Sequence, residues 1–487
     1  MGRKGQSGHN KPKKSALSRN RKDINELVDK LLRISTILQQ NDLSKSLENQ
    51  KEISIITGKL RNLQIQPKNK INLDRSAGAA TIDKFMNWCE ENGAQLKGCK
   101  IENIEGFDLG LKVCTEIPPS SLVISVPRKL MLTIEAAKKT ELKELIEKDQ
   151  MLANMTNVAL AIFLLFEKFK DESFWTPYIN ILPSAYTTVL YFNTEELEEL
   201  KGSPTLEIAL KQVKSISRQY AYFYKLFHTS NDPVSLLMRE KFTYDEYCWA
   251  VSTVMTRQNT IPSEDGEFTV NALIPLWDMC NHTNGQITTD YNPDQKRCEC
   301  LALKNYQPGE QFFIFYGART NAELFIHNGF VYEDNIHDGY WVKLGISKSD
   351  PLQEKRAELL NKLGMSPTSN FFIKKGPLPI DGGLLAFVRI FNMNEDQLRH
   401  WLENDRSDDI QYLECALDTS LEKKSWIFLQ ARLKLLLAIY KTTLEEDLKL
   451  LQEKRLSVNQ RLAIRMRTTE KIILKSGIEY VEQYIKQ

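Results

Sequence analysis

The sequence predicts an α+β protein in which a β-rich unit holds a helical insertion and is followed by an all-helical C-terminal unit. Three observations predict this fold. Short apolar segments separated by turn residues occupy 101–130 and 270–317, as in small strands. Apolar residues recur at helical spacing over about 134–250. From about Leu352 the spacing is again helical, and prolines are confined to the early loops of that region.

The N-terminal part is predicted to contain little folded structure apart from one helical arm. Residues 1–22 are basic and contain no acidic side chain, which predicts a disordered tail. A role of this tail in nuclear import or polyanion binding is the alternative. Apolar residues then recur at helical spacing from Ile24 to Leu38, before a polar stretch with Pro67. We therefore expect a helical arm over residues 23–70.

The folded body follows this arm. It is expected to begin with a helix over 82–89 that ends near Asn92-Gly93. Leu122, Ile124 and Val126 fall on one face of a short strand that Pro127 ends. The pattern gives four predicted regions: a disordered tail 1–22, a helical arm 23–70, a β-rich domain 71–344 with its insertion at about 134–250, and a helical domain 345–487.

The composition excludes several classes of protein. The chain has 487 residues, of which 42% are hydrophobic, enough for large apolar cores. The formal charge is only +2, so no strong field attracts nucleic acid, and no specific nucleic-acid partner is expected. The apolar stretch 158–166 is too short to cross a bilayer, and no secretory signal is predicted, so no membrane partner is expected.

The cysteines favour a reducing compartment. The eight cysteines are scattered and show no regular disulfide framework, so we expect free thiols. We therefore expect a cytoplasmic protein, with the nucleus as an additional location. Cys298-Glu299-Cys300 lacks the second cysteine pair of a structural zinc site, and its alternation also fits a plain strand. We therefore predict no metal.

Two short segments carry the strongest functional signal. Trp277–His282 ends in the pair Asn281-His282, and Gln311–Gly317 is an apolar strand that ends in Tyr316-Gly317. Without further evidence, such a histidine has a structural role and no catalytic one. A tyrosine at the end of a strand usually lies at the edge of the sheet with its hydroxyl in water. The glycine allows another backbone or a ligand to approach closely.

Charged residues near these segments are candidates for ligand binding. The guanidinium groups of Arg257 and Arg75 suit a ligand carboxylate, although an isolated arginine is a surface residue by default. Glu105-Gly106-Phe107 with Gly110 would fit a ribose or amino group, but a glycine-rich patch alone is a weak signal. Asp278 could bind a ligand or act as a structural cap.

These segments resemble those of SET methyltransferases that carry a Rubisco-methyltransferase-type helical substrate domain. The matching blocks occur in order and are Val126–Leu130, Phe174–Tyr178, Arg218–Tyr224, Met255–Asn259, Ala272–Gly285, Ile314–Gly317 and Asn321–Glu323. The resemblance implies that the two short segments cross in a pseudoknot beside S-adenosyl-L-methionine. The blocks are most similar to the branch that methylates a histidine of monomeric actin. They imply a protein-histidine N-methyltransferase acting on the tele nitrogen, which we expect to be a monomer.

The resemblance also assigns the site residue by residue. The implied cofactor contacts are Arg75, Glu105, Gly106, Phe107, Arg257, Asp278, Asn281, His282, Asn328, Gly329 and Phe330. The implied acceptor site consists of Asn259, Trp277, Tyr316 and Arg319, with Tyr316 and Asn259 as the catalytic pair. One departure from the family pattern is the insertion of Asp108-Leu109 after Phe107, which lengthens this loop.

The acceptor site favours histidine over lysine. An imidazole with a pKa of about 6.5 is largely neutral near pH 7, whereas a lysine amine with a pKa of about 10.4 must first lose a proton. Our hypothesis is that Asn259 fixes the imidazole tautomer, Arg319 positions the ring, and Tyr316 stacks along it, while Trp277 narrows the pocket. The alternatives are a protein-lysine methyltransferase of the same fold and a non-catalytic adaptor.

Overall fold

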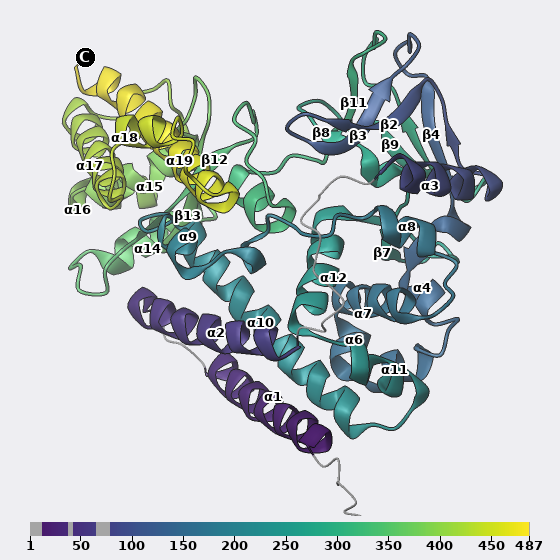
Figure 1. Cartoon of the computed structure of the whole chain (residues 1–487). Coiled ribbons are helices and arrows are strands. Elements are labelled where there is room, and N and C mark those ends of the chain that lie inside the picture. Colours follow the sequence, from purple (N-terminus) through teal and green to yellow (C-terminus); the bar gives the residue numbers. More distant parts are fainter. Residues whose placement is uncertain (1–11, 38–41, 65–77, 487) are drawn as a thin grey trace, which may run out of the picture. The chain divides into compact units, whose positions relative to one another are not determined.

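The computed structural model describes residues 12–37, 42–64 and 78–486. These residues form two compact units, and each is described by itself (Figure 1). The first unit comprises the described residues of 1–194, 207–317 and 327–329, and the second those of 195–206, 318–326 and 330–487. The sequence places the domain boundary at 344, whereas the second unit already includes 330–344. Within this stretch, strand β12 (Gly339–Gly345) pairs with β13 (Thr368–Lys374) of the same unit.

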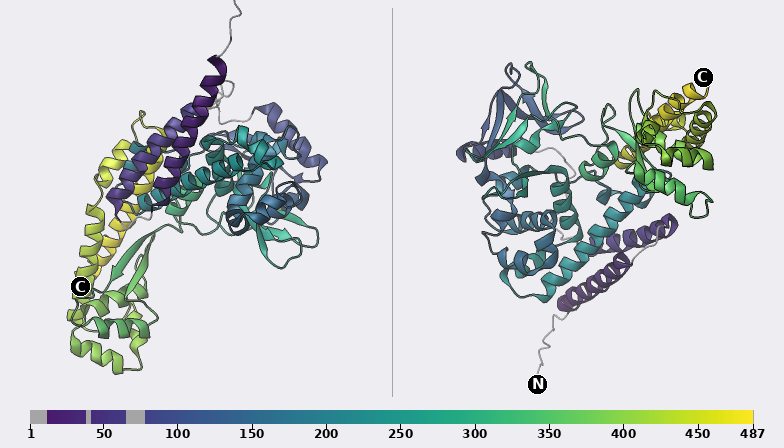
Figure 2. Two further views of the ribbon diagram at one scale, coloured as in Figure 1. Left: turned by 90° about the horizontal axis from the view of Figure 1, so that it is seen from below. Right: turned by 180° about the vertical axis from the view of Figure 1, so that it is seen from behind.

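The first unit begins with a helical hairpin. Helices α1 (Pro12–Thr36) and α2 (Leu43–Gln64) lie side by side in both views and contact each other (Figures 1 and 2). The start of α1 corrects one prediction, since residues 12–22 of the predicted disordered tail are helical. A proline at the first helical position is favoured because its φ is already suited to a helix. Residues 1–11 lie outside the described residues.

Three small sheets form the β-rich part of the first unit, with strand orders β1-β4-β10-β9, β2-β3-β11-β8 and β5-β7-β6. Their strands are β1 (Gln95–Leu96), β2 (Cys99–Ile104), β3 (Asp108–Val113), β4 (Leu122–Pro127), β5 (Leu132–Thr133), β6 (Gln258–Pro262), β7 (Thr269–Leu273), β8 (Asn281–His282), β9 (Thr289–Asn292), β10 (Arg297–Leu301) and β11 (Gln311–Ile314). The predicted strand at 122–126 is therefore confirmed. Its four central residues are all buried, and β4 pairs with β1 along one edge and with β10 along the other.

Helices before and within the insertion complete the first unit. They are α3 (Ala79–Glu91), α4 (Ile134–Ala137), α5 (Lys143–Lys148), α6 (Gln150–Asn154), α7 (Thr156–Phe169), α8 (Thr176–Ile181), α10 (Thr205–Thr229), α11 (Pro233–Lys241) and α12 (Tyr244–Arg257), while α9 (Thr194–Glu198) falls almost wholly in the second unit. The apolar stretch 158–166 forms the buried core of α7. In the described part of the chain, no helix is both long and apolar enough to span a membrane.

The second unit is mainly helical. Its elements are α13 (Asn321–Glu323), a π-helical turn (Leu324–Asn328) that ends in the first unit, β12 (Gly339–Gly345), α14 (Gln353–Lys362), β13 (Thr368–Lys374), α15 (Gly382–Asn392), α16 (Glu395–Glu403), α17 (Thr419–Ala438), α18 (Leu444–Leu450) and α19 (Val458–Ile485). The predicted α+β class is confirmed by this architecture. One detail is corrected: β13 is a strand in a region predicted as all-helical. Phe371 and Ile373 bury one face, while Asn370, Phe372 and Lys374 on the other face are half-buried or exposed.

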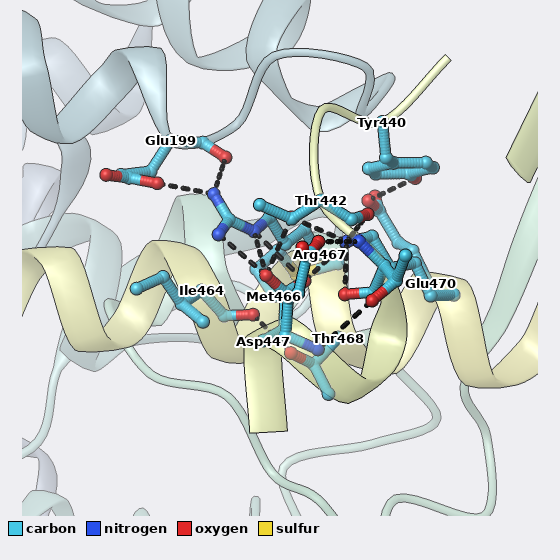
Figure 3. A network of polar contacts seen from close by, with 12 residues as sticks. Glu199, Tyr440, Thr442, Asp447, Ile464, Met466, Arg467, Thr468 and Glu470 are labelled. Carbon is cyan, nitrogen blue, oxygen red and sulfur yellow. Dashed lines mark hydrogen bonds and ion pairs between the residues drawn. The ribbon is translucent and has the colours of Figure 1, made fainter. Parts of the chain in front are cut away.

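A buried polar network joins α18 and α19 in the second unit (Figure 3). Arg467 Nη2 lies 2.7 Å from Asp447 Oδ1, and Lys471 Nζ lies 2.5 Å from Asp447 Oδ2. Thr442 Oγ1 also donates to Asp447 Oδ1 at 2.7 Å. Arg467 Nη1 also donates to the carbonyl of Glu199 and forms an ion pair with its carboxylate. Both carboxylate oxygens of Asp447 therefore have donors, so the cost of burying the charge is largely offset.

Glu470 forms a second part of this network. Its carboxylate accepts hydrogen bonds of 2.8 Å from the hydroxyls of Ser203, Thr205 and Tyr440. Complete burial raises the pKa of Glu470 to about 7, and the three hydroxyl donors only partly oppose this shift. Glu470 thus connects the segment before α10 to α19 within the second unit.

Candidate functional site

The two segments with the strongest sequence signal meet as parallel neighbours. In the pairing of β8 with β11, Asn281 lies opposite Phe313 and His282 opposite Ile314. The Tyr316 hydroxyl donates to the Cys280 carbonyl at 2.7 Å, across 36 positions of sequence. The Tyr316 backbone N–H donates to His282 Nδ1 at 3.2 Å. These bonds fix the tyrosine beside the Asn-His pair and make Nδ1 of the buried imidazole an acceptor.

A strained turn leads into the Asn-His segment. Leu276 has φ +71° and ψ −47°, values that L-residues other than glycine rarely adopt. Such a conformation costs on the order of 1–3 kcal/mol and is held only where the surrounding structure requires it. The turn continues into a short 3-10 helix, Trp277–Met279, with Trp277 buried. A leucine does not indicate a positive φ, so sequence analysis missed this turn.

A buried ion pair supports this turn. Arg257, the last residue of α12, places Nη1 3.3 Å from Asp278 Oδ2 and donates to the Asp278 carbonyl at 2.6 Å. The Tyr178 hydroxyl donates to the same Asp278 Oδ2 at 2.6 Å, and this contact joins positions 100 residues apart. Burial raises the pKa of Asp278, and Arg257 only partly offsets this shift. Tyr178 was part of a matching block, but no sequence signal indicated its contact with Asp278.

Two polar atoms of this pair have no hydrogen-bond partner among the described residues. They are the Arg257 Nε donor and the Asp278 Oδ1 acceptor, and both are buried. Buried polar atoms are nearly always paired, so such a couple requires an explanation. A ligand with a carboxylate and an ammonium group has complementary chemistry, since the first accepts and the second donates. The two residues therefore fit the amino-acid end of S-adenosyl-L-methionine.

Close packing beside Asn281 requires a glycine. The Asn281 side-chain Nδ2 donates to the Leu109 carbonyl at 3.2 Å. A Cβ on Gly110 would lie only 2.8 Å from that nitrogen and 3.2 Å from Gln311 Nε2. Both atoms of the Gln311 amide group are buried without a partner among the described residues. At Gly110 a close approach thus requires glycine. At Gly317, where the sequence also predicted one, a Cβ would meet no described protein atom within 4 Å, and the φ of +96° is what favours glycine there.

Glu105, Gly106 and Phe107 form the tip of the β2–β3 hairpin. The inserted Asp108 and Leu109 pair with Ile104 and Asn103, so the insertion lengthens the two strands and leaves the tip intact. Gly106 and Asp108 have φ of +82° and +58°. Glycine and aspartate both tolerate this left-handed region. The half-exposed Phe107 ring packs against Phe313 at a centroid distance of 5.7 Å. The tip is therefore joined to the strand that pairs with Asn281.

Two other predicted residues, Asn259 and Asn328, bond to the backbone at the end of α12, and Gly329 bonds to Thr187. Asn259 on β6 donates from Nδ2 to the Arg257 carbonyl at 3.1 Å, which orients its amide group. Asn328 donates to the carbonyl of the neighbouring Thr256 at 3.3 Å. The Gly329 carbonyl accepts from Thr187 Oγ1 at 2.6 Å.

Three predicted residues are not placed beside this cluster. Arg75 lies outside the described residues. Arg319 and Phe330 belong to the second unit, where the Arg319 carbonyl accepts from Asn335 Nδ2 at 2.8 Å. The cofactor and acceptor roles assigned to all these residues stay predictions.

The structure supplies an explanation for the cysteine motif. Cys298 and Cys300 lie on one buried face of β10, so the interpretation of this motif as a plain strand is confirmed. Within the described ranges, no group of three histidine, cysteine or carboxylate side chains could hold a metal ion. Burial raises the pKa of the Cys298 and Cys300 thiols to about 12, so both stay protonated.

The chain matches two family models. The model described as SET domain matches residues 108–317, and the model described as Rubisco LSMT substrate-binding matches residues 347–474. These matches correspond to the β-rich part of the first unit with its helical insertion, and to most of the second unit.

Similar proteins extend over most of the chain. The actin-histidine N-methyltransferase of Xenopus tropicalis is 46% identical over 400 residues, which cover 81% of this chain and 69% of that protein. The one from Homo sapiens is 45% identical over 399 residues, with 81% and 67% covered. A solved structure of Rubisco LSMT bound to sinefungin and monomethyllysine has a TM-score of 0.66 at 24% identity, covering 83% of this chain and 92% of that one. At this identity the structural likeness establishes the fold.

Proposed function

The chain belongs to the actin-histidine N-methyltransferase family, and on this premise we propose that it methylates the tele nitrogen of a histidine in actin. The methyl donor is S-adenosyl-L-methionine. The observation that carries this proposal is the parallel pairing of β8 with β11, which brings Tyr316 onto the Cys280 carbonyl next to Asn281-His282. Residues far apart in sequence thus form one polar site in the first unit.

The proposed donor site consists of residues with suitable unpaired groups. The N–H group of Arg257 Nε suits the carboxylate of S-adenosyl-L-methionine, and Asp278 Oδ1 suits the ammonium group of the same cofactor. Asn281 and the hairpin tip at Glu105–Phe107 would hold the remaining polar groups. When bound, the cofactor supplies a methyl group on a sulfonium, which passes to the acceptor nitrogen while the sulfur keeps the electron pair of the broken bond.

The proposed acceptor site orients a neutral imidazole. The Asn259 Nδ2 group already donates to the Arg257 carbonyl, so Oδ1 is the end of the amide that can accept a substrate N–H. A ring held in this way carries its proton on the nitrogen facing Asn259 and presents the other nitrogen for attack. After methyl transfer the ring is cationic, and the proton facing Asn259 can pass to solvent. Orientation of this kind is the main contribution that a displacement reaction requires.

One experiment tests this function directly. The full chain is incubated with monomeric actin and with S-adenosyl-L-methionine labelled in its methyl group, and the modified residue is mapped by mass spectrometry. We expect one methyl group on the tele nitrogen of a histidine. Methyl groups on lysine would replace this proposal with the lysine alternative, and absence of both labelling and cofactor binding would favour an adaptor.

We further infer a monomer in the cytoplasm or nucleus without a nucleic-acid partner. All eight cysteines are free thiols, which suits a reducing compartment. Light scattering of the purified chain tests the monomer, and imaging of the tagged full chain tests the compartment. A dimer, or secretion into the medium, would contradict these inferences.

A further inference from the structure

An aromatic pair lies on the outer face of the β12–β13 sheet in the second unit, where Trp341 is exposed and Phe372 is half-buried. Trp341 and Phe372 are cross-strand partners, with ring centroids 4.8 Å apart. The inner face is apolar and buried, with Tyr340, Val342 and Ile373 in the core. Trp341 nevertheless keeps 56% of its surface exposed. Aromatic side chains are costly to leave in water and are enriched at the centres of protein interfaces.

A glycine seats this pair. Gly339 begins β12, and a Cβ placed there would lie 2.1 Å from Phe372 Cζ and 2.6 Å from its Cε1. The Phe372 ring therefore lies directly over the glycine backbone, and any side chain at 339 would displace it. Gly345 lies at the other end of the same strand. A Cβ placed there would have the Thr368 Oγ1 hydroxyl as its nearest neighbour, at 3.1 Å. The arrangement of the aromatic pair thus depends on one specific glycine.

The two strands themselves carry basic charge only, and exposed apolar residues lie close to their ends in sequence. Ile336 and Leu378, 62% and 66% exposed, lie near the end of the sheet where Gly339 pairs with Lys374. Lys343 and Lys374 are the charged residues on the two strands, and both are exposed, whereas neither strand contains an acidic residue. An occupant with an apolar anchor and acidic groups complements such a surface.

We propose that this face, defined by Trp341, Phe372, Lys343 and Lys374, is a docking surface for an acidic patch on the folded protein substrate. The proposal rests on the proposed function, because it names how the substrate of that reaction is held. Strand β13 lies within residues 347–474, which match the Rubisco LSMT substrate-binding model. Two lysines are too few to neutralise a phosphate backbone, whereas exposed Trp, Ile and Leu side chains favour a protein partner.

The test compares folded monomeric actin with a short histidine-containing actin peptide, using the full chain and two readouts. The first is the Kd for actin, and the second is kcat/KM for the peptide, which lacks the acidic patch of the folded protein. For Trp341→Ala we expect the Kd for actin to rise on the order of tenfold or more, with peptide turnover unchanged. Gly339→Ala should act in the same direction, because it displaces Phe372 while keeping the tryptophan.

Two matched controls separate docking from damage to the fold. Tyr412→Ala removes an aromatic side chain that is equally exposed, at 57%, elsewhere in the second unit. Gly345→Ala makes the same change as Gly339→Ala on the same strand. Both controls should leave the Kd for actin within about twofold, a difference of roughly 0.4 kcal/mol.

Several outcomes would overturn the docking surface. Unchanged actin binding by Trp341→Ala would do so, and so would an equal loss of peptide turnover. Tight binding of a single-stranded RNA that Trp341→Ala abolishes would assign the surface to nucleic acid instead. If the wild-type chain binds actin through Trp341 but methylates no histidine, the docking surface stands and the proposed function fails.

Discussion

The two units each bury an arginine–aspartate ion pair, and the pairs differ in how fully their atoms are satisfied. In the second unit, both oxygens of Asp447 accept from Arg467, and Lys471 and Thr442 supply further donors. In the first unit, Asp278 Oδ1 and Arg257 Nε have no partner among the described residues. Similar chemistry thus gives a complete network in one unit and an incomplete one in the other.

The pKa values of the two carboxylates move in opposite directions. Burial opposes ionisation of Asp447, but Arg467 and Lys471 lower its pKa below the ordinary value. For Asp278, burial raises the pKa and Arg257 does not compensate. Incomplete pairing costs stability, so a protein retains it where it serves another purpose. The complete network suits a structural role, whereas the two atoms without a partner in the first pair suit the ligand-binding role proposed above.

The largest effect is expected from removing charge in the complete network. Asp447→Asn leaves Arg467 and Lys471 buried without a counter-charge, which should lower the free energy of unfolding of the second unit by about 3–5 kcal/mol. Asp278→Asn makes the matched change in the first unit and should cost clearly less stability, while it weakens cofactor binding. Denaturation curves and cofactor titrations measure both. Equal stability losses and unchanged cofactor affinity would remove the contrast between the networks.

The second prediction concerns pH. The folded-state pKa of Glu470, about 7, lies above the ordinary value of 4.5. A raised pKa means that its contribution to stability is fully present below pH 4.5 and is lost as the pH rises through about 7. The loss should reach about 3 kcal/mol by pH 8. Glu470→Gln should remove this part of the pH dependence in denaturation curves. A variant with the same slope as the wild type would show that Glu470 does not titrate in this range.

The third prediction concerns the incomplete site. Tyr316→Phe removes the hydrogen bond to the Cys280 carbonyl and should lower kcat on the order of 100-fold, or about 2.7 kcal/mol, with cofactor affinity retained. Tyr306→Phe is the matched control, because its hydroxyl donates at 3.4 Å to the carbonyl of Phe313 on β11, the strand that precedes Tyr316. Single-turnover kinetics and cofactor titration separate the two effects. A Tyr316 variant with normal turnover would exclude this residue from the mechanism.

The smallest effect is expected for acceptor choice. Asn259→Phe removes the amide that orients the imidazole and adds an aromatic face that attracts a lysine ammonium. Turnover on histidine should fall about tenfold, or about 1.4 kcal/mol, with a relative gain on a lysine-substituted peptide. Asn271→Phe on the neighbouring strand β7 serves as control. Mass spectrometry of both peptides measures the ratio, and an unchanged ratio would mean that Asn259 does not select the acceptor.

Much of the fold followed from periodicity in the sequence. The helical spacing of α7, the short strand β4 and the helices of the second unit are local patterns, and the structure confirms them. Strand β13 was missed because its apolar run, Phe371-Phe372-Ile373, also fits a buried helical segment. The pairing of Asn281 with Phe313 was implied by resemblance to a family, since no local pattern specifies which strands pair.

The sequence by itself determined the elements and the residue types at the site, because helical and strand periods and turn residues act over a few positions. Only the tertiary structure decided that Tyr178 contacts Asp278 across 100 positions and that Leu276 adopts a positive φ. It also decided that Arg257 Nε and Asp278 Oδ1 are buried without a partner among the described residues. Those features depend on how several elements pack around one point. Packing of this kind sets contacts and burial together, and no short stretch of sequence contains that information.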